Sequence, residues 1–269
     1  MKRQRAAVCT TATEEFTATL YGSIWNRLSD AAFEELSELH WKRFHASGLP
    51  GDYLVGKICL DAGCGSGRAV RSMLRSGAKL VWAIDIGKDC LANTQRRNGE
   101  YGDRLEIAAA SVLKLPFQDN FFDFVHCDGV LHHTRDPFGG FKELVRVAKP
   151  GAPIMFGVYG AGGLLNVGIY GARLLHRMIP RSLVERVLKL FTADPIKHYV
   201  FLDPFYVPIR KVYRPRDIEA WALETKLTQM RRIVIKTEYK GWNRVLKDYS
   251  SFGPWFRGEG YLMHIAFKG

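Results

Sequence analysis

The glycine-rich stretch at positions 58–67 constrains this chain more than any other feature. Apolar residues lead into Asp61, glycines then alternate along the chain, and a helix-like segment begins at Arg68. The pattern predicts a strand, a tight turn and a helix N-terminus, because residues without side chains let backbone N–H groups approach a bound ligand closely. The glycines concerned are Gly63, Gly65 and Gly67.

A second apolar run, at positions 79–84, ends in Asp85. An acid at the end of the second strand of an open α/β sheet is placed to accept both hydroxyls of a ribose. The turn reads Asp-x-Gly-x-Gly-x-Gly, whereas dinucleotide-binding proteins carry Gly-x-Gly-x-x-Gly. Asp61 would put a negative charge beside a pyrophosphate. The turn therefore argues against NAD or FAD and suits a ligand that has an ammonium and a sulfonium.

Several ordered segments of the chain match the motifs of one enzyme family. They are Asp61–Gly67, Ala83–Ile86, Leu115–Asp119 with Phe122–Val125, Val130–His133 with Asp136–Pro137, and Leu144–Gly151. Through them the chain resembles the class I S-adenosylmethionine-dependent methyltransferases, and more narrowly the small-molecule branch that includes ubiquinone, menaquinone and natural-product methyltransferases. The resemblance implies S-adenosylmethionine as methyl donor, S-adenosylhomocysteine as its product, and no metal.

The resemblance also implies a cofactor site. Asp61 and its glycines would cradle the amino-acid tail, Asp85 would bind the ribose, and the Val112 N–H would read the adenine edge. One position departs from the family pattern, because the Asp that bonds the adenine amine aligns with Ser111, which lacks the charge. The expected cofactor-binding residues are Asp61, Gly63, Gly65, Gly67, Asp85, Ile86, Ser111, Val112 and Cys127.

Strand and helix patterns alternate from position 57 to position 158, which predicts an α/β fold with a parallel sheet and right-handed crossovers. The expected strands lie near 57–61, 80–85, 105–109, 122–127 and 153–159, and the expected helices near 67–76, 88–99 and 138–148. The resemblance implies a Rossmann-like seven-stranded sheet in the order 3-2-1-4-5-7-6 with the last strand antiparallel. Arg231–Thr237 and Tyr261–Phe267 would then be the sixth and seventh strands.

We expect four regions along the chain. They are an N-terminal helical cap (1–50), a cofactor-binding core (51–159), a lid insertion (160–230) and C-terminal strands that complete the sheet (231–269). The insertion is far longer than an ordinary loop. Amphipathic helices are predicted at Leu164–Met178 and Ser182–Phe191, and a third begins near Pro215. In the family that the chain resembles, such an insertion covers the acceptor substrate.

Aromatic and basic residues of the cap and the lid are candidates for acceptor binding. The aromatic ones could line an apolar acceptor pocket or simply pack the lid. The basic cluster at positions 210–216 could bind a carboxylate or phosphate on the acceptor, or it could be solvated. The candidates are Tyr21, Trp25, Tyr199, Phe205, Tyr206 and Arg210.

His132 and His133 follow the expected fourth strand, at the edge of the sheet where ligands bind. Methyl transfer from a sulfonium is an in-line displacement, and a hydroxyl acceptor must also lose a proton. Either histidine could be the catalytic base that takes this proton. The alternative is that one of the two only braces the loop.

The net charge of +12 is unevenly distributed. Residues 1–170 contribute +2 and residues 171–269 contribute +10. The basic half is a solvated face, or it attracts an anionic substrate, an acidic lipid surface or nucleic acid. Residues 164–191 combine apolar and arginine positions, which makes peripheral membrane contact a further candidate. Five cysteines without CxxC spacing, and no recognisable signal peptide, predict a reduced, cytoplasmic protein without a cysteine metal site.

These patterns favour a methyltransferase that acts on a small natural-product or lipid-like acceptor, with an anionic group on the acceptor left open. Oxygen is the preferred acceptor atom, ahead of carbon. One alternative is a nucleic-acid methyltransferase that uses the basic half. Cys127-Asp-Gly-Val-Leu-His in place of Asn/Asp-Pro-Pro-aromatic argues against it. Another alternative is a non-catalytic cofactor-binding protein. The sequence determines neither the acceptor nor the oligomeric state.

Overall fold

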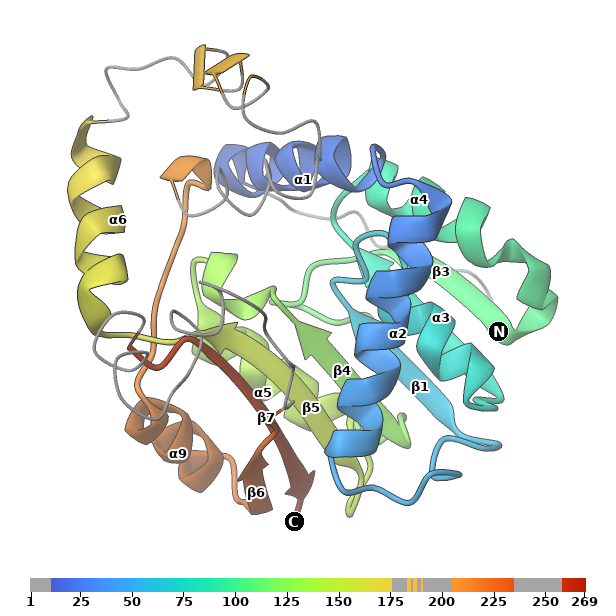
Figure 1. Ribbon diagram of the computed structural model, residues 1–269. Coiled ribbons are helices and arrows are strands. Elements are labelled where there is room, and N and C mark those ends of the chain that lie inside the picture. Colours follow the sequence, from blue (N-terminus) through green and yellow to red (C-terminus); the bar gives the residue numbers. More distant parts are fainter. Residues whose placement is uncertain (1–10, 176–182, 185, 188–189, 191–204, 235–257) are drawn as a thin grey trace.

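The computed structural model describes residues 11–175, 183, 184, 186, 187, 190, 205–234 and 258–269. A seven-stranded sheet forms its centre, in the order β3-β2-β1-β4-β5-β7-β6 (Figure 1). Strand β7 is antiparallel to β5 and β6, and the other pairs are parallel. The strands are β1 Ile58–Ala62, β2 Leu80–Asp85, β3 Leu105–Ala109, β4 Phe124–Asp128, β5 Pro153–Tyr159, β6 Leu227–Arg232 and β7 Tyr261–Lys268. The predicted fold class and strand order are confirmed.

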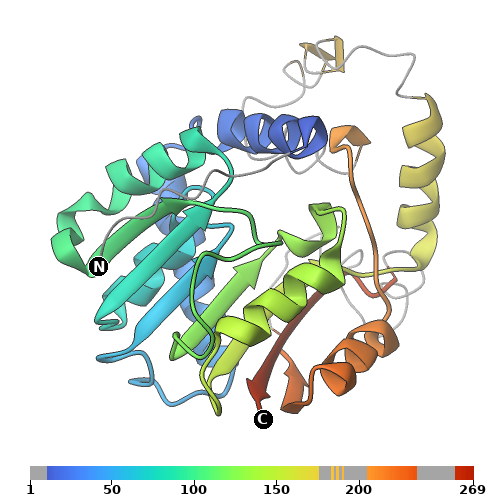
Figure 2. The same cartoon turned by 180° about the vertical axis from the view of Figure 1, so that it is seen from behind.

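Helices cover both faces of the sheet (Figures 1 and 2). Helices α2 (Asp30–Ala46), α3 (Arg68–Arg75) and α4 (Lys88–Asn98) lie on one face, and α5 (Pro137–Val147) and α9 (Pro215–Glu224) on the other. Two covered faces explain why the central strands are continuous apolar runs. In β5, every residue except the last is buried.

Helix α1 (Ala12–Trp25) lies across the carboxyl ends of the strands and covers that edge of the sheet (Figure 1). It begins with a capping box in which the Glu14 N–H donates to the Thr11 hydroxyl and the Thr11 N–H donates to the Glu14 carboxylate. Such reciprocal bonds satisfy two of the donors that a helix N-terminus leaves open. The box therefore fixes the start of a helix that lies over the ligand edge of the sheet.

The predicted sixth strand, Arg231–Thr237, is wrong in its position. Strand β6 starts four residues earlier, where Leu227 pairs with Lys268 of β7. The backbone of Lys226 turns with a φ of 56° directly after α9, so pairing begins at once, and an irregularity between Thr228 and Arg231 shifts the register. The apolar alternation near Ile233 suggested the later start, while residues 235–237 lie outside the described residues.

Two predicted lid helices are seen only in part. Helix α6 spans Gly163–Leu175, so it starts one residue before the predicted Leu164, and the predicted end at 176–178 lies outside the described residues. Within the second prediction, the described residues at 183, 184, 186, 187 and 190 are helical. Among the described helices, none joins enough length to enough apolar character to cross a bilayer.

Four cysteines fall within the described residues, and all four are buried free thiols. Burial raises the pKa of each thiol, most clearly at Cys64 and Cys127. Thiols that stay protonated are poor nucleophiles and poor metal ligands. Cys59, Cys64 and Cys127 therefore serve as small residues of the core, whereas Cys90 packs with Trp25 and Leu28 under α1.

Candidate functional site

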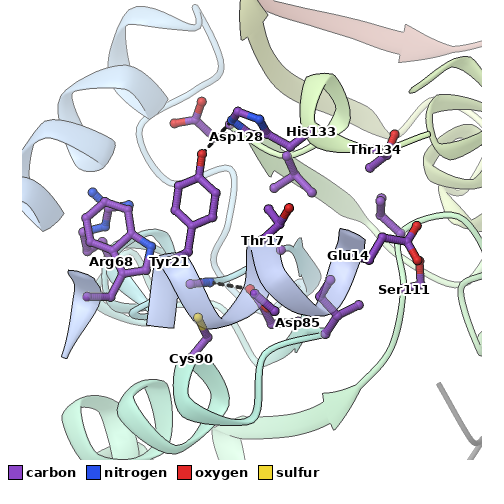
Figure 3. A pocket seen from close by; sticks show the side chains of 18 of the residues that line it. Glu14, Thr17, Tyr21, Arg68, Asp85, Cys90, Ser111, Asp128, His133 and Thr134 are labelled. Carbon is purple, nitrogen blue, oxygen red and sulfur yellow. Dashed lines mark hydrogen bonds between the residues drawn. The ribbon is translucent and has the colours of Figure 1, made fainter. Parts of the chain in front are cut away.

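A cavity of about 410 Å³ lies under α1, at the carboxyl ends of β1, β2 and β4 (Figure 3). Residues from both sheet and cap line it, which places the predicted helical cap over the predicted cofactor turn. The predicted cofactor residues that reach the cavity are Gly63, Gly65, Asp85, Ile86, Ser111 and Val112. The edge of the sheet where strand order reverses is the ligand site of open α/β folds.

Asp85 is fixed at the end of β2 by two backbone donors. Its Oδ2 accepts from the Gly65 N–H at 3.0 Å and its Oδ1 from the Gly87 N–H at 2.8 Å. Burial raises the pKa of the Asp85 carboxyl, and these two hydrogen bonds oppose that rise because they favour the ionised form. The result is an oriented carboxylate on the cavity wall that has acceptor capacity left for a ligand hydroxyl.

The glycine turn creates space and does not offer free donors. The Gly63 and Cys64 N–H groups both donate to the Ile84 carbonyl, at 2.8 and 2.9 Å, and the Gly65 N–H is bound to Asp85. Gly63 has a φ of 83°, and a Cβ there would lie 2.3 Å from Val130 Cγ2. The turn thus ties β1 to β2 and lets the cavity reach the backbone, and the approach of its N–H groups to a ligand stays a prediction.

Asp61, Gly67 and Cys127 do not line this cavity. Asp61 is 2% exposed, and one of its carboxylate oxygens is 2.7 Å from His126 Nδ1 of β4. Gly67 is packed against Asn98 and Thr94 of α4. Cys127 is fully buried in the core of β4. The apolar run before Asp61 places it correctly at the end of β1, but no local pattern shows that a histidine on the next strand would hold its carboxylate.

An ionic cluster at the opposite end of the cavity was not predicted. Asp128, the last residue of β4, accepts hydrogen bonds from Arg43 of α2 and from the Tyr261 hydroxyl of β7. Burial alone would raise the pKa of Asp128, but Arg43, assisted by His40, His126 and Tyr261, outweighs burial and holds that pKa well below its usual range. Arg43 is 85 residues from Asp128, so no sequence spacing could have paired them.

His40, His126 and Asp128 bring potential metal-ligand atoms within 4.8 Å of one another. Arg43 contacts one Asp128 oxygen and Tyr261 the other. A guanidinium therefore already supplies the positive charge that would balance this carboxylate. The arrangement favours a buried ionic network over a cation site, and the predicted lack of a metal stays a prediction.

Glu14 is a second cavity residue that sequence reasoning missed. It is 6% exposed, and its carboxylate lies on the same side of the cavity as Ser111 (Figure 3). Its Oε2 accepts the Thr11 N–H at 2.9 Å. The capping pattern of Thr11 and Glu14 is visible in the sequence, but that pattern indicates a helix start and gives no sign of a ligand contact.

The two adjacent histidines occupy different environments. His133 lines the cavity, its Nδ1 is 2.8 Å from the Ile209 carbonyl, and its Nε2 is 2.7 Å from the Tyr21 hydroxyl (Figure 3). A carbonyl only accepts, so Nδ1 carries a proton. In the neutral ring, Nε2 is then the basic nitrogen, and it accepts from Tyr21 at the cavity wall.

His132 is fully buried between His133 and Tyr159, with ring centroids 4.1 and 4.0 Å away. Neither of its ring nitrogens has a hydrogen-bond partner in the described parts of the chain. Burial, then the neighbouring His133 and Arg210, lower the pKa of His132 well below its usual value. This ring is neutral at physiological pH and has no place on the cavity wall.

The predicted acceptor-binding residues divide between cap and lid. Tyr21 and Trp25 of α1 line the cavity, and the Arg68 guanidinium lies 3.9 Å from the centre of the Trp25 ring. Phe205 and Tyr206 form a described helical turn that does not line it. Arg210 packs against Tyr159 at 5.3 Å. Tyr199 lies outside the described residues.

Several known proteins are similar to this chain in sequence or in fold. The model of a family described as a methyltransferase domain matches residues 60–156. A ubiquinone biosynthesis O-methyltransferase from Nitrosospira multiformis is 31% identical over 173 residues, which is 60% of this chain and 71% of that protein. The corresponding enzyme from Pseudomonas putida (strain GB-1) is 29% identical over 84% of both chains.

A solved structure agrees with the fold. The magnesium protoporphyrin IX methyltransferase from Synechocystis PCC 6803, with S-adenosylhomocysteine bound, has a TM-score of 0.55 and 14% identity, and the alignment covers 95% of this chain and 96% of that one. The sequence relatives, the strand order of the sheet and the cavity at the point where that order reverses all indicate the same class of enzyme. The chain therefore belongs to the class I S-adenosylmethionine-dependent methyltransferases, in the small-molecule branch, and is an enzyme of that class.

Proposed function

We propose that this methyltransferase transfers a methyl group to a hydroxyl oxygen of a small acceptor and that His133 is the base. The observation that carries the proposal is the fixed tautomer of His133, whose unprotonated Nε2 lies at the cavity wall. The relatives from Nitrosospira and Pseudomonas, which are named as O-methyltransferases, support oxygen as the acceptor atom. A general base held by a third group is the usual arrangement for activating a hydroxyl.

The residues of the cavity fit the two ends of S-adenosylmethionine. Asp85 would accept from the ribose hydroxyls, and Ser111, Val112 and Glu14, which also line the cavity, would hold the purine end. At the other end, Arg43, which Asp128 holds at the cavity wall, suits the carboxylate of the amino-acid tail. Asp61 would act through His126, which it holds in place, and not by direct contact. When bound, the cofactor supplies an electrophilic methyl group.

The chain's own residues handle the proton of the acceptor hydroxyl. Tyr21 donates to His133 Nε2 across 2.7 Å. Because this nitrogen has a single lone pair, an acceptor hydroxyl would displace the Tyr21 hydroxyl and donate from its position. His133 accepts that proton on Nε2, and the Ile209 carbonyl stabilises the resulting imidazolium through Nδ1–H. Helix α1 lies over the carboxyl ends of the strands (Figure 1), and its residues line the cavity, where they would keep bulk water from the reacting atoms.

Replacement of His133 tests the base. His133→Gln should lower kcat by roughly 10²–10⁴-fold, the usual contribution of a general base, while S-adenosylhomocysteine affinity, measured by calorimetry, stays the same. Turnover is measured as S-adenosylhomocysteine release with a panel of small phenols. The matched control is His45→Gln, at an exposed position of α2. Full activity in His133→Gln would remove the base from this mechanism, and cofactor binding without turnover on any phenol would favour a non-catalytic protein.

The acceptor is proposed to be lipid-like and to be met at a membrane surface. Helix α6 exposes large apolar side chains along much of its length, and the described part of this helix carries one charged residue, Arg173. The surplus of positive charge in residues 171–269 is complementary to an anionic bilayer. The exposed side chains are Leu164, Leu165, Val167 and Tyr170.

A further inference from the structure

The partly buried guanidinium of Arg210, which pairs with no carboxylate of the described residues, lies next to Tyr159 of the cavity wall. Arg210 donates through one terminal nitrogen to Asn166 Oδ1 at 2.6 Å, and its guanidinium lies 5.3 and 5.7 Å from the Tyr159 and Tyr170 ring centres. Its Nε and other terminal nitrogen are buried and have no hydrogen-bond partner in the part of the chain that the structure describes, nor does any described carboxylate pair with it. Unpaired buried charge is costly, so this geometry indicates a missing anion.

A second set of unsatisfied polar atoms adjoins the first. The Lys211 N–H donates to the His132 carbonyl at 3.0 Å, which fixes the segment that carries Arg210 against the two histidines. His132 is fully buried, and both of its ring nitrogens lack partners among the described residues. The neutral ring can supply one N–H donor next to the guanidinium. This N–H and the two unsatisfied nitrogens of Arg210 therefore lack acceptors among the described residues.

These donors lie directly behind the cavity wall. Tyr159 lines the cavity. Its ring centre lies 4.0 Å from that of His132 and 5.3 Å from the Arg210 guanidinium. His133, the proposed base, lines the cavity, and its ring centre lies 4.1 Å from that of His132. A group bound by Arg210 and His132 would therefore be close to the hydroxyl that His133 deprotonates.

We propose that the acceptor carries an oxyanion, a carboxylate or a phosphate, and that Arg210 and His132 bind it. Donors without acceptors, together with a full positive charge, suit an oxyanion better than a neutral amide or hydroxyl, because only the anion also neutralises the charge. The proposal rests on the proposed function, since it names the chemical class of the acceptor for the same site. It predicts substrates in which a hydroxyl and an acidic group share one small molecule.

The test compares an acid with its neutral ester. Calorimetry of the full-length, S-adenosylhomocysteine-bound protein measures binding of 3,4-dihydroxybenzoate and of its methyl ester, with benzoate and inorganic phosphate as further probes. The acid should bind roughly 10–100-fold more tightly than the ester, as expected for hydrogen bonds to charged groups. Competition by phosphate as well as benzoate would indicate a phosphate ester as the natural group, and competition by benzoate alone a carboxylic acid.

Substitutions test whether Arg210 and His132 cause the preference for the acid over the ester. Arg210→Met should abolish the preference for the acid with little change for the ester, and Arg210→Lys should retain part of it. His132→Leu should reduce it further in the Lys background. Arg216→Met, at an exposed position of the same segment, is the matched control. Cofactor affinity reports whether each variant is folded, and if Arg210→Met does not fold, the wild-type comparison and Arg210→Lys decide.

The failures of the two proposals are distinguishable. Equal affinity of the wild type for acid and ester, no binding of any of the anions, or a preference that survives in Arg210→Met would overturn the oxyanion site and leave methyl transfer intact. Absence of heat with S-adenosylhomocysteine itself would instead overturn the proposed function. If 3,4-dihydroxybenzoate is methylated, its KM should be lower than that of the methyl ester in the wild type. In Arg210→Met the two KM values should be similar.

Discussion

At the scale of single residues, the cavity is defined by side chains whose partners are distant in sequence. Asp85 receives its donors from the adjoining turns, so a local motif was enough to place it. Asp128 depends on Arg43 and Tyr261, which come from the cap and from the last strand. A carboxylate that must be paired across the whole chain gives no local signal, which is why this end of the cavity could not be predicted.

Glu14 allows a residue-scale prediction about the purine end. Glu14→Gln keeps the capping geometry but removes the charge that would attract the exocyclic amine of adenine. S-adenosylhomocysteine affinity should fall roughly tenfold, as for a hydrogen bond to a charged group, whereas the deaminated analogue S-inosylhomocysteine should lose little. Calorimetry with both ligands makes the measurement, and Glu15→Gln at the exposed neighbouring position is the control. An equal loss for both ligands would contradict amine recognition.

At the scale of elements, periodic patterns predicted most helices and strands, but the hydrogen-bonded pairing of strands set the start of β6. The core strands lie where apolar runs indicated, because burial on both faces leaves a strong signal. Strand β6 is half exposed and irregular, so its hydrogen bonds to β7 and not its apolar pattern set its start at Leu227. Sequence also identified both histidines, but only their surroundings separate the cavity residue His133 from the buried His132.

Helix α6 allows an element-scale prediction about membranes. The protein should co-sediment with phosphatidylglycerol vesicles, and replacing both Leu164 and Val167 by Ser should weaken this roughly tenfold or more, because two exposed apolar side chains lose their burial in lipid. Leu223→Ser on α9, which is 82% exposed, is the control for apolar surface elsewhere. No sedimentation of the wild type even at low salt would remove membrane contact from the proposed function.

At the scale of the whole molecule, buried histidines link stability to pH. Burial, reinforced by Arg232, lowers the pKa of His264 in β7 to about 4. The folded protein therefore binds fewer protons than the unfolded chain between about pH 4 and the unfolded pKa of roughly 6.5. Stability conferred by the neutral ring is present above pH 6.5 and is lost as the pH falls through that window.

Urea unfolding at pH 7 and pH 5 measures the effect. His264 should account for a loss of roughly 2 kcal/mol between these values, from the pKa difference. His264→Gln should unfold with a shallower pH dependence by that amount, while the buried His40 and His132 continue to contribute in both proteins. His45→Gln, at an exposed position, should keep the wild-type slope. Identical slopes for His264→Gln and the wild type would contradict this assignment.

The bond between the Ile209 carbonyl and His133 Nδ1 has one more consequence. The segment that contains Ile209 thereby determines that Nδ1 of His133 holds the hydrogen. The position of this segment therefore leaves Nε2 free of hydrogen for the proposed proton transfer. A variant in which this segment were displaced would keep the imidazole but lose the contact that sets its tautomer.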